Sequence, residues 1–159
     1  MKEGPKYGYY PSPEKSYLVV HPNFVEKAQT LFADFKVNVV TGFRFLGGFI
    51  GDFQETENWI NEKVKTWVKA IECLAAELQP HLAQVSLTKS LQNVWNYVQR
   101  VVANVEKPFI LLRTALESTF LPALFGSAVN QAELSLMLLS GHNGGLGHGI
   151  RDPVDSPTL

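Results

Sequence analysis

The chain has 159 residues, of which 45% are hydrophobic and 18% are charged, so it carries enough apolar side chains for the core of about one domain. Its 14 basic residues nearly balance 15 acidic residues, and a net charge of −1 argues against a free-standing nucleic-acid-binding protein. No apolar run approaches the ~18 to 20 residues of a membrane-spanning helix, and the first seven residues contain no hydrophobic signal segment. These features predict an intracellular globular protein that does not enter a membrane.

The first 40 residues contain two short β-rich runs with a helical pattern between them. Residues 16–20 (Ser-Tyr-Leu-Val-Val) and 37–40 (Val-Asn-Val-Val) are predicted strands, because β-branched and aromatic side chains favour the extended backbone. Between them, apolar residues from Phe24 to Phe35 recur at helical spacing, and Asn23 with Glu26 has the spacing of a capping box. The order is therefore strand, helix, strand.

A glycine pair interrupts the next apolar stretch. Phe43 to Leu46 and the dipeptide Phe49-Ile50 flank Gly47 and Gly48. A glycine pair inside a strand-like pattern indicates a bulge, a tight turn or a close approach of the backbone. Together, residues 1–51 are predicted to form a β-α-β-β segment.

Helical periodicity begins at residue 52. Asp52 and Glu55 have capping-box spacing, and the apolar residues that follow recur with a 3.6-residue period. The apolar residues of this long helix are Trp59, Ile60, Val64, Trp67, Val68, Ile71, Leu74, Ala75 and Leu78.

A second helix is predicted from about His81 to Ala103. Its apolar face consists of Val85, Leu91, Val94, Trp95, Val98 and Val102. Because Trp67 and Trp95 lie on the apolar stripes of neighbouring helices, we expect both to be buried, each facing the other's helix.

Prolines, caps and glycines mark the remaining elements. Pro108 fits the first turn of a third helix, which Pro122 should kink or end. Asn130 can cap a short fourth helix that ends near Leu139, followed by a glycine-rich loop and, over residues 151–159, a flexible tail. The predicted fold is α+β, with the β-α-β-β segment over residues 1–51 and an all-helical bundle of about four helices over residues 52–150.

The candidate reactive side chains do not assemble into a catalytic site. The four histidines, His21, His81, His142 and His148, are scattered and have no Cys or carboxylate beside them at metal-ligand spacing. Cys73 has apolar neighbours and is expected to be a buried helix residue. Metal-dependent phosphoryl transfer needs paired carboxylates, and the sequence has no Asp-Asp or Asp-x-Asp pair. We therefore expect no metal, no cofactor and no enzymatic activity from the chain on its own.

Several stretches have a residue order that resembles one family. Residues 6–20 (Lys-Tyr-Gly-Tyr-Tyr-Pro-Ser-Pro-Glu-Lys-Ser-Tyr-Leu-Val-Val) resemble the segment of retroelement reverse transcriptases that follows the metal-binding hairpin, where a lysine precedes a palm strand. Residues 45–51 (Phe-Leu-Gly-Gly-Phe-Ile-Gly) resemble the primer-grip turn of that family, and residues 120–124 and 144–147 resemble its closing segments. The resemblance covers about residues 4–154 and depends on the order and spacing of these motifs.

The resemblance implies a palm edge over residues 1–51 and a thumb-like bundle after it, which would contact a primer–template duplex. Lys15 takes the position of a possible proton donor to the leaving pyrophosphate, and the primer grip falls on Phe45, Leu46 and Gly47. The basic residues that would contact nucleic acid are Lys63, Lys65, Lys69, Lys89 and Arg100. The metal-binding aspartates of the family lie upstream of the matching segment, so the resemblance implies a fragment without the catalytic centre. Its partners would be the duplex, the remainder of a polymerase, or another protein.

Simpler interpretations of these residues remain open. Lys15 can be a solvated lysine beside a strand, and residues 45–47 can be a hydrophobic turn that packs on the first helix. The lysines of the long helix can pair with Glu62, Glu72 and Glu77 at (i, i+3) or (i, i+4).

A different class of function is the main alternative. Trp59, Trp67 and Trp95 recur at helical positions and could line an aromatic groove of a helical protein–protein interaction module. Aromatic stripes at helical spacing usually belong to a core, so the burial of these side chains distinguishes the two interpretations.

Overall fold

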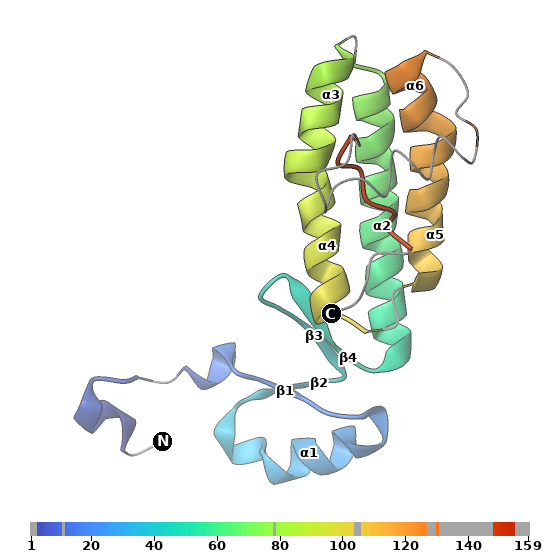
Figure 1. Cartoon of the computed structure of the whole chain (residues 1–159). Helices are drawn as coiled ribbons and strands as arrows, with labels where there is room; N and C mark the ends of the chain where they lie inside the picture. Colours follow the sequence, from blue (N-terminus) through green and yellow to red (C-terminus); the bar gives the residue numbers. More distant parts are fainter. Residues whose placement is uncertain are drawn as a thin grey trace. The chain divides into compact units, whose positions relative to one another are not determined.

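The structure is a computed structural model, and it describes residues 3–10, 12–77, 79–103, 106–126, 130 and 148–154 (Figure 1). The chain divides into two compact units, residues 1–56 and residues 57–159. Short strands in two small sheets precede a series of helices, which confirms the predicted α+β class.

The first unit contains a parallel β-α-β arrangement. Strands β1 (Tyr17–Val19) and β2 (Asn38–Val40) pair in parallel, with Leu18 opposite Val39. Helix α1 (Val25–Leu31) connects them, flanked by 3₁₀ turns at Pro22–Phe24 and Ala33–Phe35. Both predicted strands and the predicted helical region are confirmed, although the helix is divided into three short pieces.

The predicted capping role of Asn23 is wrong. Asn23 lies inside the 3₁₀ turn that Pro22 begins, because the fixed φ of proline suits the first position of such a turn. Its backbone N–H donates to Nδ1 of His21 at 3.3 Å, so His21 caps this turn. The residue that precedes α1 is Phe24, which makes no side-chain capping bond.

Strands β3 (Gly42–Phe45) and β4 (Gly48–Gly51) form an antiparallel hairpin. Leu46 (φ +47°) and Gly47 (φ +84°) connect them, and two central residues with positive φ define a two-residue turn of type I′. The sequence left a bulge, a tight turn or a close approach open, and the structure has the tight turn. At the open end of the hairpin Gly42 lies opposite Gly51, where a Cβ on either residue would meet the Phe49 ring at 2.8 Å or less.

The base of the hairpin is tied to the start of helix α2 (Phe53–Ala75). Oδ1 of Asp52 accepts a hydrogen bond from the Glu55 N–H at 2.8 Å, which confirms Asp52 as the helix cap. The second half of the predicted capping box is not formed: the Glu55 carboxylate accepts from the Thr41 hydroxyl, and the Asp52 N–H donates to the Thr41 carbonyl at 3.2 Å. Thr41 therefore connects the hairpin with the first turn of the helix.

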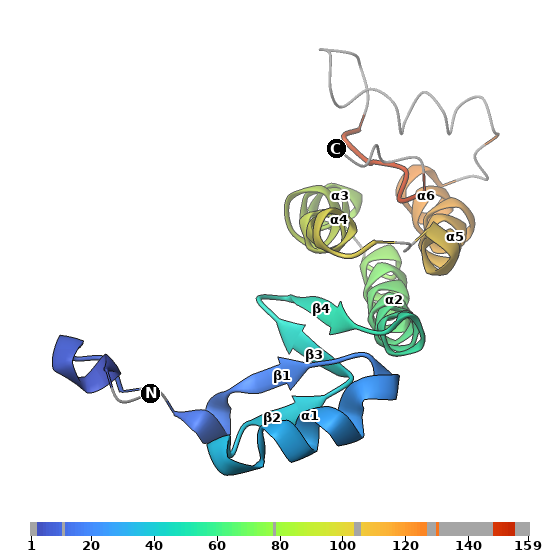
Figure 2. The same ribbon diagram turned by 90° about the horizontal axis from the view of Figure 1, so that it is seen from below.

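The second unit is a helical bundle. Beside α2 run a second rod of α3 (Pro80–Ser86), a π turn (Leu87–Leu91) and α4 (Gln92–Val101). The third rod consists of α5 (Glu106–Ala115), a π turn (Leu116–Phe120) and α6 (Leu121–Phe125). In Figure 2 the three rods stand at the corners of a triangle. The predicted fourth helix lies outside the described residues except for Asn130, which is not helical.

The π turn of the second rod changes which residues face the core. Along the second rod, the buried residue that follows Leu87 is Gln92, five positions later. The interval is longer than in a regular α-helix because a π turn inserts one extra residue. A regular 3.6-residue period across this point places Val85 and Val94 in the core, whereas both are exposed. These two predicted core positions are wrong for that reason.

Pro122 does not end the third rod. It stands at the start of α6, directly after the π turn, and the helix continues to Gly126, whose N–H donates to the Pro122 carbonyl at 2.8 Å. A proline inside a regular α-helix clashes with the carbonyl four residues earlier, and the wider π turn relieves this crowding.

The core lies between the three rods and confirms most of the predicted apolar positions. Trp95 is fully buried and Trp67 is 5% exposed, and the Trp67 ring packs edge-on against Phe109 of α5 with centroids 5.9 Å apart. Trp67 and Trp95 belong to the same core cluster, which confirms that both are buried; that each faces the other's helix stays a prediction. The buried hydrophobic residues are Ile60, Val64, Trp67, Ile71, Ala83, Leu87, Trp95, Val98, Val102, Phe109, Leu112, Ala115, Leu116, Phe120, Leu121 and Ile150.

Three further sequence predictions are corrected. Cys73 is exposed, because it lies two residues beyond Ile71 and off the buried stripe of α2. The helix Lys107–Phe125 is long and apolar enough to cross a membrane by length and composition, so the expectation that the sequence contains no such segment is wrong. A helix of a bundle core meets the same criterion. Residues 151–154 do not form a free tail, since Pro153 is buried and Asp152 pairs with Arg113 of α5.

Candidate nucleic-acid interface

The tip of the β3–β4 hairpin carries an exposed arginine and two large exposed apolar residues. Phe45 is 53% exposed and Leu46 is 76% exposed, and Arg44 and Gly47 are also exposed. The side chains of Phe45 and Leu46 therefore do not pack into a core, and the interpretation of residues 45–47 as a turn buried on the first helix is not supported. The resemblance to a primer-grip turn falls on these same residues.

Leu46 adopts a backbone conformation that leucine disfavours. A type I′ turn prefers Asn-Gly or Asp-Gly, because an L-residue with a branched side chain loses about 1–2 kcal/mol in the left-handed region. Here the leucine side chain lies in solvent, so burial does not offset the cost. Strained positions of this kind concentrate at functional sites, and this one therefore supports a functional hypothesis for the hairpin.

The rest of the first unit also exposes aromatic side chains. Among its described residues only Ala28 and Gly48 are buried. Tyr17 of β1 stacks on Phe43 of β3, with ring centroids 3.9 Å apart and an interplanar angle of 21°. The other large exposed apolar residues of this unit are Tyr7, Tyr9, Tyr10, Phe24, Leu31, Phe32, Phe35, Ile50 and Phe53.

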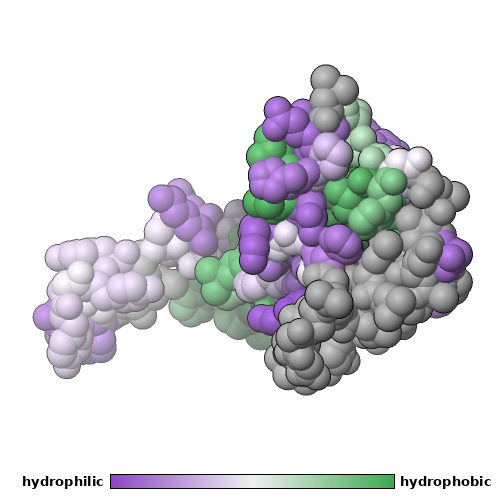
Figure 3. Space-filling view, turned by 45° about the horizontal axis from the view of Figure 1, so that its top comes forward, coloured by the Kyte–Doolittle hydropathy of each residue, from purple (hydrophilic) through white to green (hydrophobic). Residues whose placement is uncertain are grey.

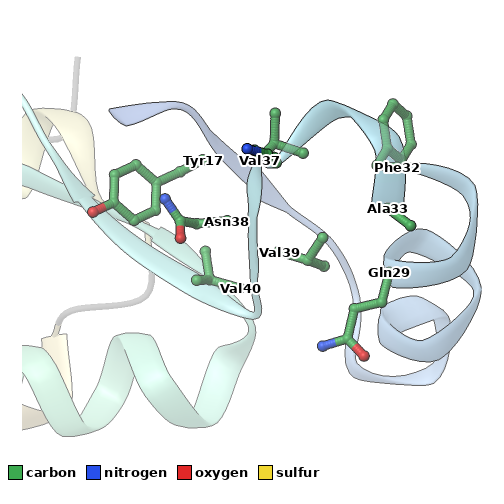
Figure 4. Close-up of a pocket in the computed structure, with 9 residues that line it drawn as sticks. Tyr17, Gln29, Phe32, Ala33, Val37, Asn38, Val39 and Val40 are labelled. Atoms are coloured by element: carbon green, nitrogen blue, oxygen red, sulfur yellow. The ribbon is translucent and has the colours of Figure 1, made fainter. Parts of the chain in front are cut away.

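A pocket between α1 and β2 does not have the composition of a catalytic site. In Figure 4 the side chains of Gln29, Phe32, Ala33 and Val39 lie on the side of β2 that faces α1. The side chains of Tyr17, Asn38 and Val40 lie on the opposite side of the strand. Lys36 and Tyr17 are the titratable residues of the lining, so the pocket holds no acid–base pair of carboxylate and histidine.

Lys15 is the last residue of a 3₁₀ turn, Pro13–Lys15, and one residue, Ser16, separates it from β1. Its side chain is exposed. This is the arrangement expected of a solvated lysine beside a strand, and a role in proton donation stays a prediction from the resemblance.

Two of the predicted nucleic-acid contacts on α2 already have intramolecular partners. Lys65 pairs with Glu62 at 2.7 Å, at the (i, i+3) spacing considered from the sequence. The hydrogen bond and the positive charge of Lys65 lower the pKa of the Glu62 carboxyl, and the charge of Lys69 adds a smaller effect in the same direction. Nζ of Lys63 lies 5.7 Å from the centroid of the Trp59 ring, a cation–π distance.

The remaining predicted contacts are dispersed over two rods. Lys69 lies on α2, Lys89 lies in the π turn after α3, and Arg100 lies in the last turn of α4; all three are exposed. On the face drawn in Figure 3, hydrophilic and hydrophobic residues are interspersed over the described surface. The structure does not bring the basic residues of the bundle into one described cluster.

The aromatic groove of the alternative function is not formed by the tryptophans. Trp67 and Trp95 belong to the core and are 5% and 0% exposed, and Trp59 packs partly against that core. Among the described residues there is also no group of three His, Cys, Asp or Glu side chains that could hold a metal ion.

No family model, curated protein or solved structure matches this chain. The hairpin is the feature that bears on function, because its tip is exposed and strained at the residues that resemble a primer-grip turn. The sequence identified Phe45, Leu46 and Gly47 but missed Arg44, the exposed β3 residue directly before them in the chain. Its position directly before the Phe-Leu-Gly-Gly run was the available signal.

Proposed function

We propose that the chain contacts a primer–template duplex through the β3–β4 hairpin, as a palm-edge and thumb-like segment of a reverse-transcriptase-related protein. The observation that carries this proposal is the exposed leucine at the left-handed position of the type I′ turn, Leu46, next to the exposed Phe45. The left-handed backbone of the tip costs free energy in the unbound protein. A ligand that covers the apolar side chains removes them from water, and this gain offsets the cost.

The tip offers two kinds of contact to a nucleic-acid strand. Arg44 supplies a charge for a phosphate, and Phe45 and Leu46 supply apolar surface for sugars and the faces of bases. Neither contact reads the edges of bases, so binding is independent of sequence. On the bundle, Lys69, Lys89 and Arg100 are exposed and are proposed to make separate phosphate contacts, whereas Lys65 is engaged with Glu62.

Fluorescence anisotropy with a labelled RNA–DNA hybrid duplex tests the proposal. We expect weak binding, with a dissociation constant of roughly 100 μM, that weakens as salt increases. Arg44→Ala should lower the salt slope by about one unit, and Phe45→Ala should weaken binding without changing the slope. Lys27→Ala is the matched control for the lost charge, since Lys27 is an exposed lysine of α1 in the same unit. Absence of binding at low salt would contradict the proposal.

A second candidate is a helical protein-interaction module, now without the tryptophan groove. Exposed apolar side chains on the second rod favour it: Leu82, Val85, Val94, Tyr97 and Val101 are each 43–48% exposed. Substituting Val94 and Tyr97 by polar residues would reduce self-association or partner binding in this case and leave duplex binding unchanged. Sedimentation velocity of the parent and this double variant distinguishes the two candidates.

A further inference from the structure

Residues 148–154 lie along the helical bundle as a segment without helix or strand structure. Figures 1 and 2 show this segment in red between α3–α4 and α5–α6, on the side of these rods that faces away from α2. Ile150 is fully buried in the bundle core, and Pro153 is among the fully buried side chains. The segment thus fills a groove between two helical rods.

Three glutamines of the second rod bind the backbone of this segment. Gln84, Gln92 and Gln99 are eight and seven residues apart, which is about two helical turns each, so they lie along one side of the rod. We call them the glutamine ladder. Nε2 of Gln84 donates to the His148 carbonyl at 3.1 Å, and Nε2 of Gln99 donates to the Pro153 carbonyl.

Gln92, the middle residue of the glutamine ladder, both donates to and accepts from the backbone of the segment. Nε2 of Gln92 donates to the Gly149 carbonyl at 3.0 Å, and its Oε1 accepts from the Arg151 N–H at 2.7 Å. A side-chain amide that donates and accepts in this way replaces the pairing of a neighbouring strand. Gln92 is only 4% exposed, so its two hydrogen bonds are shielded from water. Losing either partner would leave a buried polar atom unsatisfied, which is costly.

Side chains of the segment add selectivity. Ile150 fills the apolar part of the groove, and the Asp152 carboxylate pairs with the guanidinium of Arg113 from α5. Gly149 has φ +71°, a left-handed conformation that favours glycine. Arg151 is the exception, because only its backbone N–H takes part in the interactions described for the segment.

We propose that this groove is a binding site for an extended peptide with the order Gly-Ile-x-Asp-Pro, and that the same segment of a second copy of the chain can replace the resident one. The glutamine ladder binds peptide carbonyls and an N–H, which give affinity, while Ile150, Asp152 and Pro153 give selectivity. The resident segment belongs to the same chain and therefore competes intramolecularly with a free peptide, so weakening its contacts makes the site accessible to a peptide in trans.

The experiment uses the full chain carrying Asp152→Ala, which removes the carboxylate partner of Arg113 from the resident segment. The probe is a fluorescein-labelled peptide with the sequence of residues 148–154, His-Gly-Ile-Arg-Asp-Pro-Val, and the readout is anisotropy. We expect this chain to bind the probe at least tenfold more tightly than the parent chain does. A probe with Asp152→Ala should bind at least tenfold more weakly, whereas a probe with Arg151→Ala should bind within twofold of the original.

Two further variants of the host test the glutamine ladder. Adding Gln92→Ala should abolish binding, whereas adding Asn93→Ala should not, because the Asn93 amide donates to the Lys89 carbonyl of its own rod. If the Asp152→Ala chain does not fold by far-UV circular dichroism, Asp152→Asn is the host, since it keeps the shape of the side chain and loses the charge. A folded host that does not bind the probe would overturn the proposal, as would equal binding of the Arg151→Ala and Asp152→Ala probes.

Discussion

Replacing Trp95 by alanine is expected to destabilise the helical unit by about 3–5 kcal/mol. Trp95 is fully buried in α4, and a buried aromatic side chain removes roughly 150–250 Å² from water, which at ~25 cal/mol per Å² corresponds to about 4–6 kcal/mol. Its Nε1 has no hydrogen-bond partner among the described residues, and an unsatisfied buried donor costs about 1–3 kcal/mol. The net loss is therefore smaller than the area alone indicates.

The unpaired Nε1 makes Trp95→Phe an informative companion. Phenylalanine keeps an aromatic ring in the core and removes the unsatisfied N–H, so it should cost much less than alanine. Urea unfolding followed by far-UV circular dichroism measures both variants, and Val94→Ala is the control at an exposed neighbour, with an expected change within about 0.5 kcal/mol. A Trp95→Ala midpoint equal to that of the parent would refute the assignment of Trp95 to the core.

Three other predictions follow from the described contacts. Asp52→Ala should destabilise by about 1 kcal/mol in urea unfolding, because the Glu55 N–H loses its cap, and Asp52→Asn should retain most of the stability. Lys65→Ala should raise the pKa of Glu62, which NMR titration measures, because Lys65 lowers this pKa. The stability that the pair contributes is therefore present above the pKa of Glu62 in the unfolded chain, and it is lost as the pH falls through the pKa of Glu62 in the folded chain. The chain should not extend a primer with Mg²⁺ or Mn²⁺, because its sequence has no Asp-Asp or Asp-x-Asp pair to hold the two metal ions, and incorporation above a no-protein control would contradict this.

The regular elements were predictable because their signals are local. Ile60, Val64, Trp67 and Ile71 recur with a helical period, which places them on one face of a helix. All four residues are buried. The strands of the first unit follow from β-branched runs in the same way. The π turn at Leu87–Leu91 was not predictable, because one extra residue in a helix leaves both flanking patterns intact and changes only their relative phase.

The less predictable features depend on contacts between distant residues. Gln84, Gln92 and Gln99 look like a solvated polar face until the segment 148–154 is placed against them, although their eight- and seven-residue spacing was a signal. The turn at Leu46-Gly47 was expected as one of three possibilities, but leucine is not a residue that indicates a type I′ turn. Its conformation is imposed by the pairing of β3 with β4, and so the exposed, strained tip emerges only from the structure.

Leu46→Asn tests the proposed function most directly, because it separates binding from folding. Asparagine tolerates the left-handed position, so the variant should keep the hairpin and gain up to about 1 kcal/mol in stability while losing the apolar tip. Covering about half of a leucine side chain is worth roughly 1 kcal/mol, so anisotropy with the hybrid duplex should show about fivefold weaker binding. Leu31→Gln, at an exposed leucine of α1, is the matched control and should bind as the parent does. Binding of Leu46→Asn equal to or tighter than that of the parent would contradict the nucleic-acid role of the hairpin.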